Sequence, residues 1–401
     1  MSNVVIAGYP ELANMNPLLA IGRDLVARGH TVVIYTGARF EDHVRSTGAC
    51  FRAFPAEVDF DDLRLDRHLA ERENLRPGLA RMVFDMKAGL IDPIPVLFHD
   101  LRALIKEFAA DVVLSEQTFL PVLALAGPQR PTLVTLGTFC PMFLSADTAP
   151  PGAARPPQGR ARNRAMNAKV RDYMAGAQAA AEGTFATLGV PLEDYLWNAA
   201  LRHTDHYLQL SIPSFEYRRG DVPAHFRFVG PILPALGAGA GRRMFVGGRP
   251  IVAVSDLVVP SMLALADNGH AEAAAPLDDL VPRAEVLITD GNADDVHLAL
   301  RHGVPSVVAA SAAEEAEVAA RLEWTGTGIN LHTGTPTLAD IRGAVQTILR
   351  DRRFRTRTEP LMREATRSRP FDAIAEIVEE ASPRPPRFPP GRTSDVKAPQ
   401  S

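Results

Sequence analysis

Residues 285–331, EVLITDGNADDVHLALRHGVPSVVAASAAEEAEVAARLEWTGTGINL, constrain the fold more than any other stretch of this chain. Short β-branched runs at 286–289 and 304–309 alternate with segments of helical period, so the order is strand, turn, helix, strand, loop, helix, strand. This alternation is typical of a parallel sheet covered by helices. The stretch therefore predicts an α/β fold, in which the turn between strand and helix is a common anion site.

That turn, residues 290–295, has the place of an anion site but carries negative charge. Asp290, Asp294 and Asp295 lie where the helix begins. Their carboxylates complement the helix dipole themselves, and each would repel a phosphate by roughly 1 to 4 kcal/mol at ~4 Å. A divalent cation bridging acids and phosphate is one interpretation. A self-capped helix without a ligand is the other, and we favour it.

Bulk properties exclude several classes of protein. The chain has 401 residues, enough for two domains, and its net charge of -4 gives no general attraction to nucleic acid. Cys50 and Cys140 have no metal-ligand spacing, so we expect neither a disulfide framework nor a metal site. No apolar run approaches ~20 residues and no signal peptide is visible, so we expect a cytoplasmic protein without membrane contact.

Composition also indicates the domain boundaries. We expect a first domain over 1–234 and a linker over 235–248, which is rich in Gly and Ala. A second domain is expected over 249–382, and a Pro-rich disordered tail over 383–401. Within the first domain, a helix is expected to start at Asn16 and Pro17, and residues 149–159 should be a mobile loop.

Three further segments support a resemblance. They are NPLLAIGRDLVARGHTVVIYTG from Asn16, FRFVGPILP from Phe226, and the block 160–234. Together with 285–331 they resemble the family-one glycosyltransferases that tailor macrolides, aromatic polyketides and enediynes, over nearly the whole chain to about Glu380. The resemblance implies the GT-B fold, with two Rossmann-like domains facing a cleft. It also implies a hydrophobic small-molecule acceptor, an antibiotic or other secondary metabolite, and a UDP- or TDP-sugar donor if the protein is active.

The resemblance assigns donor positions that are altered here. The family's His- or Asn-Gly-Gly motif falls on Asp290, Gly291 and Asn292, and two later glycines fall on Asp294 and Asp295. The other donor positions are Ser255, in the family's Ser/Thr-Gly loop, and Glu314 with Glu315, at its sugar-contacting acid-amide pair. About 30 residues, one βαβ unit, are missing between residues 254 and 286, so the second domain should be shortened and lack a central strand.

The family's catalytic base is also replaced. Its Gly-His-x-Asn-Pro pattern reads Ala13-Asn14-Met15-Asn16-Pro17, so Asn14 occupies the histidine position. An amide has no useful basicity near neutral pH. The aspartate that orients the histidine falls on Glu116. Glu116 could act as a base if burial raises its pKa, or it could hydrogen-bond Asn14 in a purely structural pair.

Large flexible side chains in the first domain suggest an acceptor cleft, since Met and Phe suit an irregular hydrophobic ligand. Ordinary core packing would explain several of them. The candidate cleft residues are Met82, Phe84, Phe119, Phe139 and Met142.

Three functions remain open from the sequence. The first is a natural-product glycosyltransferase whose sugar-nucleotide transfer is impaired or altered. The second is a non-catalytic homologue that binds or stabilises a partner glycosyltransferase, or shields a hydrophobic intermediate. The chain could also form a homodimer. The third is a donor-independent cyclase or isomerase that uses the acceptor cleft, with Glu116 as acid or base.

Overall fold

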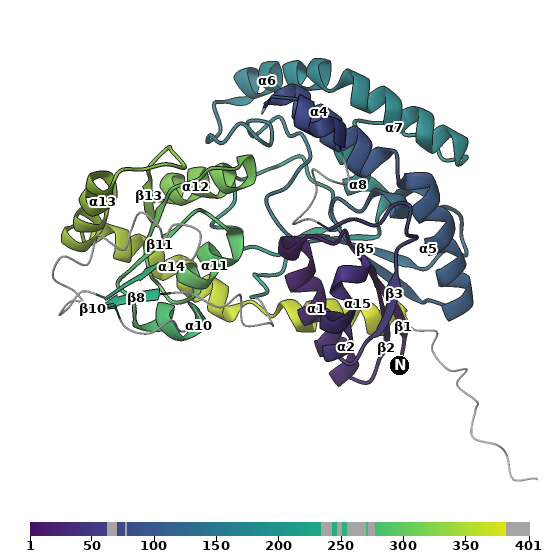
Figure 1. The fold of residues 1–401 in the computed structure, drawn as a ribbon, viewed down its shortest axis with the longest axis horizontal. Coiled ribbons are helices and arrows are strands. Elements are labelled where there is room, and N and C mark those ends of the chain that lie inside the picture. The colour runs from purple at the N-terminus through teal and green to yellow at the C-terminus, as the bar shows by residue number, and fades with distance from the viewer. Residues whose placement is uncertain are drawn as a thin grey trace, which may run out of the picture.

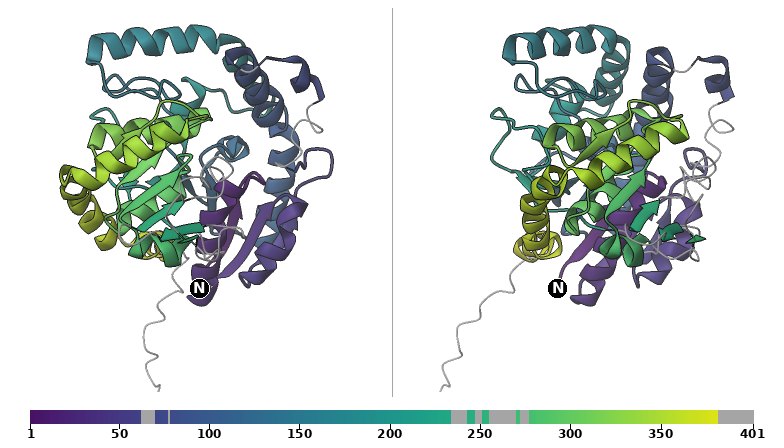
Figure 2. Two further views of the ribbon diagram at one scale, coloured as in Figure 1. Left: turned by 60° about the vertical axis from the view of Figure 1, so that its left-hand side comes forward. Right: turned by 90° about the vertical axis from the view of Figure 1, so that its left-hand side faces the viewer.

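The computed structural model describes residues 1–61, 70–76, 78–233, 243–246, 251–254, 270–271 and 277–381. Two parallel-rich sheets, each flanked by helices, form two lobes, and a layer of helices lies above them (Figures 1 and 2). Ser255, the tail 383–401 and most of the predicted linker lie outside the described residues.

The first sheet has seven strands, all parallel, in the order β3-β2-β1-β4-β5-β6-β7. Helices cover both faces, which explains why its central strands are continuous apolar runs. Successive side chains of β1 point to opposite faces of the sheet. Val5 is buried in the core on the α5 side, and Ile6 is buried in the core on the α1 side. The strands are β1 (Asn3–Ala7), β2 (Thr31–Thr36), β3 (Cys50–Ala53), β4 (Val112–Glu116), β5 (Thr132–Gly137), β6 (His206–Gln209) and β7 (Phe226–Phe228).

The helices of this lobe include a π-helix, η4, directly after α4. Helices α6 and α7 lie above the sheets in all three ribbon views (Figures 1 and 2). The first helix begins at Leu12, four residues before the predicted start at Asn16. The helical elements are α1 (Leu12–Ala27), η1 (Ala38–Phe40), α2 (Glu41–Ser46), η3 (Ala70–Asn74), α4 (Leu79–Asp85), η4 (Met86–Ile91), α5 (Ile94–Phe108), η5 (Leu120–Ala124), α6 (Arg160–Tyr173), α7 (Ala175–Thr187) and α8 (Leu196–His203).

The second sheet has the order β10-β8-β9-β11-β12-β13. The unit predicted to be missing between residues 254 and 286 falls largely outside the described residues, so that prediction stays open. Among the described residues, β9 pairs directly with β11 in parallel, and β12 and β13 continue the same parallel sheet. Antiparallel β8 and β10 follow β9 on its other side, so 243–246 of the predicted linker form a strand. The strands are β8 (Arg243–Val246), β9 (Ile251–Val254), β10 (His270–Ala271), β11 (Val286–Thr289), β12 (Ser306–Val308) and β13 (Gly328–Asn330).

The last helix, α15, returns to the first lobe (Figure 1). Ile374, Ile377 and Val378 are buried in the same core as α1 and β1, and the Ser2 hydroxyl donates to the Val378 carbonyl at 3.0 Å. Residues 370–381, predicted within the second domain, therefore pack with the first. The helical elements of this half are α10 (Leu277–Leu280), η8 (Val281–Arg283), α11 (Ala293–Arg301), α12 (Ala313–Thr325), α13 (Leu338–Arg350), α14 (Arg353–Arg367) and α15 (Pro370–Ala381).

Candidate active site

The turn between β11 and α11 uses its own backbone amides. The Gly291 N–H donates to the Thr289 hydroxyl at 3.2 Å, and the Asn292 N–H donates to Asp290 Oδ1 at 3.0 Å. Asn292 in turn caps the helix, since its Oδ1 accepts from the Asp294 N–H at 2.9 Å. Three of the N–H groups around this helix start, those of Gly291, Asn292 and Asp294, are thus already hydrogen-bonded to side chains of the turn.

Gly291 permits this tight turn. Its φ is +102°, and a Cβ there would meet Val308 Cγ1 at 2.8 Å and the Glu315 carbonyl oxygen at 3.0 Å. A side chain would be strained by both the backbone conformation and the contacts. The glycine retained from the family motif is therefore required by the turn's own geometry.

Carboxylates surround this turn. Asp290 and Asp295 are buried and share the Thr289 hydroxyl, at 3.1 Å and 3.2 Å. Burial raises the pKa of Asp290 above its usual range, and the charge of Glu315 adds to this shift. Asp294 faces the other lobe, where Asn16 Nδ2 donates to it at 3.4 Å. The turn is accordingly acidic and internally satisfied.

A pocket of about 220 Å³ lies beside the turn, between the two lobes. It brings together most of the predicted donor positions: Gly291, Asn292, Asp294, Glu314 and Glu315 line it. Glu315, however, caps its own helix, because its Oε2 accepts from the Ser311 and Ala312 N–H groups, each at 2.8 Å. Glu314 is solvent-accessible and lines the pocket, and its partial burial raises its pKa above the usual range.

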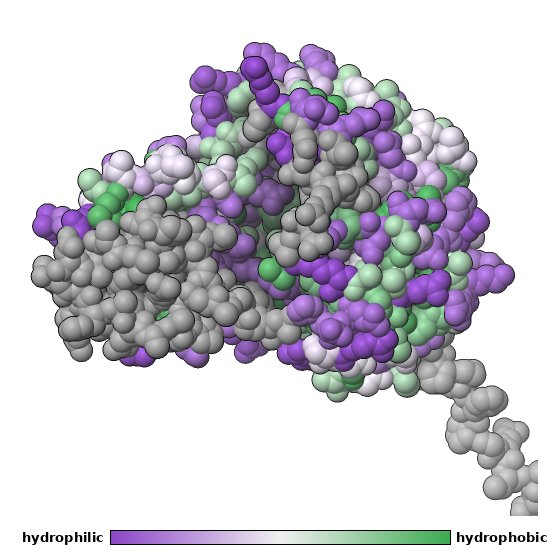
Figure 3. All heavy atoms as spheres, viewed as in Figure 1, coloured by the Kyte–Doolittle hydropathy of each residue, from purple (hydrophilic) through white to green (hydrophobic). Residues whose placement is uncertain are grey.

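A larger cavity of about 380 Å³ adjoins this pocket, and the surface between the lobes is hollowed (Figure 3). Phe139 and Glu314 line both spaces, so the two meet there. Apolar side chains of the first domain, from residues 58 to 197, form most of the wall. They are Val58, Phe60, Met82, Met86, Leu90, Pro93, Phe139, Met142, Pro151 and Trp197.

Three of the predicted cleft residues, Met82, Phe139 and Met142, line this cavity, and two do not. Phe119 is 1% exposed and packs against the Tyr9 and Phe54 rings, so it belongs to the core. Phe84 follows Met82 by two residues on α4, and positions two apart on a helix point to different sides. Their assignment to the cleft was wrong for these reasons.

Asn14 and Glu116, the positions of the family's catalytic pair, have different partners. The Thr138 hydroxyl donates to Asn14 Oδ1 at 3.0 Å, and Asn14 Nδ2 donates to Glu11 Oε2 at 3.2 Å. Glu116 is 1% exposed, and its carboxylate accepts from the Thr118 N–H at 2.5 Å and from the Thr118 hydroxyl at 2.7 Å. Of the two alternatives for Glu116, a structural pair with Asn14 does not match these partners.

Glu116 is closed off from the cavity, which Thr118 lines in its place. Burial raises the pKa of Glu116 to about 7, and the Thr118 hydrogen bonds oppose that shift. The carboxylate nevertheless has no path to a molecule in the cavity, so a catalytic role as acid or base does not fit.

Glu11 is a cavity residue that the sequence reasoning missed. It precedes α1 and lines the cavity near Glu314 of the other lobe. Solvent reaches Glu11 through the open cavity, yet protein surrounds the carboxylate on most sides. This desolvation raises its pKa to about 7, and the charge of Glu314 adds to the shift. Its spacing of three residues from Asn14 would have been a signal, had the helix been placed at Leu12.

A buried ion network joins the two lobes behind the cavity. Arg321 of α12 contacts Glu317 Oε2 at 2.6 Å and Glu216 Oε2, from the first lobe, at 2.9 Å. Glu317 Oε1 also accepts from the Ala154 N–H at 2.7 Å. The loop 149–159, predicted to be mobile, is therefore attached to α12, and its Pro151 and Gly152 line the cavity.

Comparisons with known proteins agree with this geometry. Residues 246–381 match the family described as Erythromycin biosynthesis protein CIII-like, C-terminal domain. The 4'-demethylrebeccamycin synthase of Lentzea aerocolonigenes is 31% identical over 93% of this chain and 98% of its own length. The chain belongs to the family-one GT-B glycosyltransferases. UDP-glycosyltransferase 2 of Phaeomoniella chlamydospora, 29% identical over 94% of this chain and 95% of its own, is a further relative.

Solved glycosyltransferase structures share the fold. The glycotransferase of kitacinnamycin has a TM-score of 0.71 at 20% identity and covers 95% of this chain and 99% of its own. The calicheamicin glycosyltransferase has a TM-score of 0.71 at 17% identity and covers 95% and 98%. The predicted family and the predicted α/β GT-B fold are confirmed.

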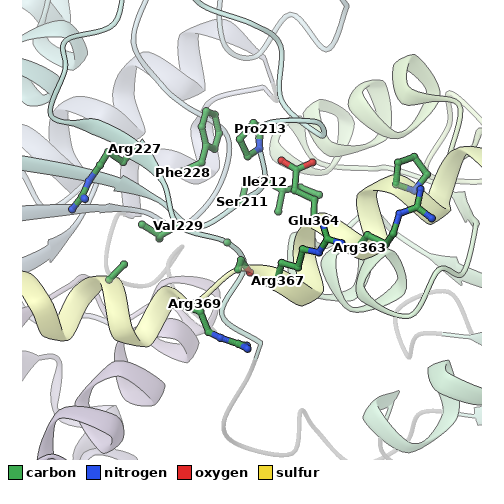
Figure 4. A pocket seen from close by; sticks show the side chains of 14 residues that line it. Ser211, Ile212, Pro213, Arg227, Phe228, Val229, Arg363, Glu364, Arg367 and Arg369 are labelled. Carbon is green, nitrogen blue, oxygen red and sulfur yellow. The ribbon is translucent and has the colours of Figure 1, made fainter.

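Other features of the described residues add no second site. They contain no group of three or more His, Cys, Asp or Glu side chains placed to hold a metal, and none of their helices is long and apolar enough to cross a membrane. A pocket of about 590 Å³ lies where β6 and β7 meet α14 (Figure 4). Its Arg227, Arg363 and Arg369 spread in different directions, so they do not converge on one point.

Proposed function

We propose that this GT-B family protein binds a hydrophobic aglycone of natural-product biosynthesis and that its transfer from a nucleotide sugar is impaired. The observation that carries the proposal is the donor turn, where the Gly291, Asn292 and Asp294 N–H groups already bond to side chains of the same turn. A diphosphate would have to replace these bonds.

The energetic cost favours weak donor binding. Giving up three hydrogen bonds costs about 1 kcal/mol each, which corresponds to roughly a hundredfold loss of affinity. Asp294 and Glu314 also face the same pocket, and each adds repulsion to a UDP or TDP diphosphate. Both effects act on the nucleotide and leave the acceptor side untouched.

The acceptor side supports binding of a flat or irregular apolar molecule. Met82, Met86 and Met142 are adaptable thioethers, and Phe139 and Trp197 offer ring faces. Among the described lining residues there is no Lys, Arg or His, so an anionic acceptor is disfavoured.

A fluorescence titration tests both halves of the proposal. Trp197 lines the cavity, so a hydroxyanthraquinone probe should quench its emission on binding, whereas UDP and TDP should bind far more weakly. Asp294→Asn removes one repelling charge and should strengthen UDP binding by about tenfold. Asp172→Asn, an exposed change on α6, is the matched control and should have no effect.

Two results would contradict the proposal. Tight UDP or TDP binding by the unmodified chain, with efficient transfer to the probe, would show that the donor site works. No binding of probe or nucleotide, together with co-purification of a partner glycosyltransferase, would favour the auxiliary role instead.

A further inference from the structure

We propose that Glu11 is the general base of this protein and takes the proton of the acceptor hydroxyl. The inference rests on the proposed function, because it requires the acceptor to occupy the 380 Å³ cavity. Glu11 lines that cavity, and Glu314, which faces it, lies where the cavity meets the donor-side pocket. The acceptor hydroxyl must reach the sugar at this junction.

A hydrogen-bonded chain holds Glu11 in place. The Thr138 hydroxyl donates to Asn14 Oδ1, which directs the Asn14 amide N–H₂ toward Glu11 Oε2 at 3.2 Å. Asn14 is 2% exposed, so this orientation is fixed by packing. Asn14 therefore acts as a positioning residue, and the base is Glu11, the hydrogen-bond partner of the residue at the family's histidine position.

The other acids facing the cavity are already engaged or lie elsewhere. Asp85 contacts Arg72 at 2.7 Å, and Glu317 contacts Arg321 at 2.6 Å. Glu116 and Tyr9 lie behind Glu11 and are buried. Glu314 belongs to the second lobe and opposes Glu11 across the junction.

The proton balance is simple. The acceptor oxygen attacks the anomeric carbon while its O–H proton moves to the Glu11 carboxylate. The bond from the anomeric carbon to the diphosphate oxygen breaks, and the nucleoside diphosphate leaves with the electron pair. The protonated Glu11 then releases its proton to solvent through the open cavity.

The pKa of Glu11, raised to about 7, suits this task, because a base titrating near neutral pH is both partly ionised and reasonably basic. Glu314 contributes to that shift through its like charge. Removing the charge of Glu314 should lower the pKa of Glu11. The acid limb of the pH-rate profile of a Glu314→Gln variant should then lie at lower pH than that of the unmodified chain.

Variants test the role in transfer. Glu11→Gln should lower kcat by about 10²- to 10⁴-fold while the Kd of the hydroxyanthraquinone stays unchanged. Glu314→Gln should shift the acid limb downward. Because Glu314 also lines the donor pocket, the pH of that limb is compared and not the absolute rate. Glu193→Gln, an exposed change outside both cavities, is the control and should match the unmodified chain. An unchanged kcat and acid limb in Glu11→Gln would overturn the assignment.

A second readout does not depend on transfer. In protein labelled with ¹³C at glutamate carboxyls, the signal that disappears in Glu11→Gln should titrate near neutral pH. It should shift when the hydroxyanthraquinone is added, but not with its O-methyl ether, which has no proton to share. A Glu11 signal that responds equally to both probes would overturn the inference. A chain that binds neither probe would instead contradict the proposed acceptor site.

Discussion

At the scale of single residues, environment decides what a carboxylate can do. Glu11 and Glu116 share a pKa raised to about 7, and burial is the largest cause for both. Glu11 opens to the cavity, whereas Glu116 bonds Thr118 inside the core. Sequence matching selected Glu116 because it occupies a family position. It did not select Glu11, because the helix start was placed at Asn16 and because Glu314, whose charge adds to the pKa shift of Glu11, is 303 positions away in the chain.

Glu116 should make stability depend on pH. Its native pKa of about 7 exceeds the ordinary value near 4.5, so between these values the folded chain binds more protons than the unfolded chain. Stability must then fall as pH rises through that window, by ~3 kcal/mol in total for this group. Glu116→Gln should flatten the dependence, so that urea unfolding at about pH 5 and about pH 8 differs less than in the unmodified chain.

The control for that experiment is Glu57→Gln, an exposed change. Loss of a Thr118 hydrogen bond lowers the variant's stability at both pH values, so the difference between the two is the informative quantity. An unaltered pH dependence in Glu116→Gln would contradict the buried, neutral carboxyl.

At the scale of elements, sequence patterns correctly predicted the helices and strands that depend on neighbouring residues in the chain. The strand expected at 286–289 is β11 (Val286–Thr289), and the helix expected after the turn 290–295 is α11 (Ala293–Arg301). The hydrophobic period and the capping residues lie within each segment, so the local sequence is enough to predict such an element. The start of α1 was misplaced because Pro17 resembles a first-turn proline, although it lies inside the helix.

Helix α12 takes part in an ion network with the other lobe that local sequence patterns do not predict. Its Arg321 bonds Glu317 of the same helix and Glu216 of the other lobe, and all three side chains are buried. Arg321→Met should leave Glu317 without its cation and Glu216 with Arg219 alone, at 3.5 Å, and destabilise the chain by about 3 to 5 kcal/mol. Denaturant unfolding measures this, with Arg350→Met on the exposed side of α13 as the control. A decrease in the free energy of unfolding below about 1 kcal/mol would contradict this expectation, because it would mean that water solvates the carboxylates once Arg321 is removed.

At the scale of the whole molecule, the chain ties its two lobes together at several points. The Asn16–Asp294 contact bridges α1 and α11, and the Ser211 hydroxyl lies 3.1 Å from His297 Nε2. Burial lowers the pKa of His297 to about 4, so it stays neutral in this contact. Composition alone indicated a two-domain protein but not these bridges, since residues far apart in sequence form them.

Helix α15 packs against the first lobe and should be needed for its stability. Ile374, Ile377 and Val378 are almost fully buried against the first lobe, and each contributes about 1.5 to 3 kcal/mol of apolar burial. Their sum approaches the usual net stability of a domain. A chain ended at residue 369 should therefore lose cooperative unfolding and bind a hydrophobic dye, while a chain ended at Ala381 keeps every contact of α15. Asp372→Asn breaks only the partly exposed pair with Arg28 and should cost less than about 1 kcal/mol. If the shorter chain unfolded as cooperatively as the longer one, the first lobe would be complete without α15, and the helix would serve only to join the lobes.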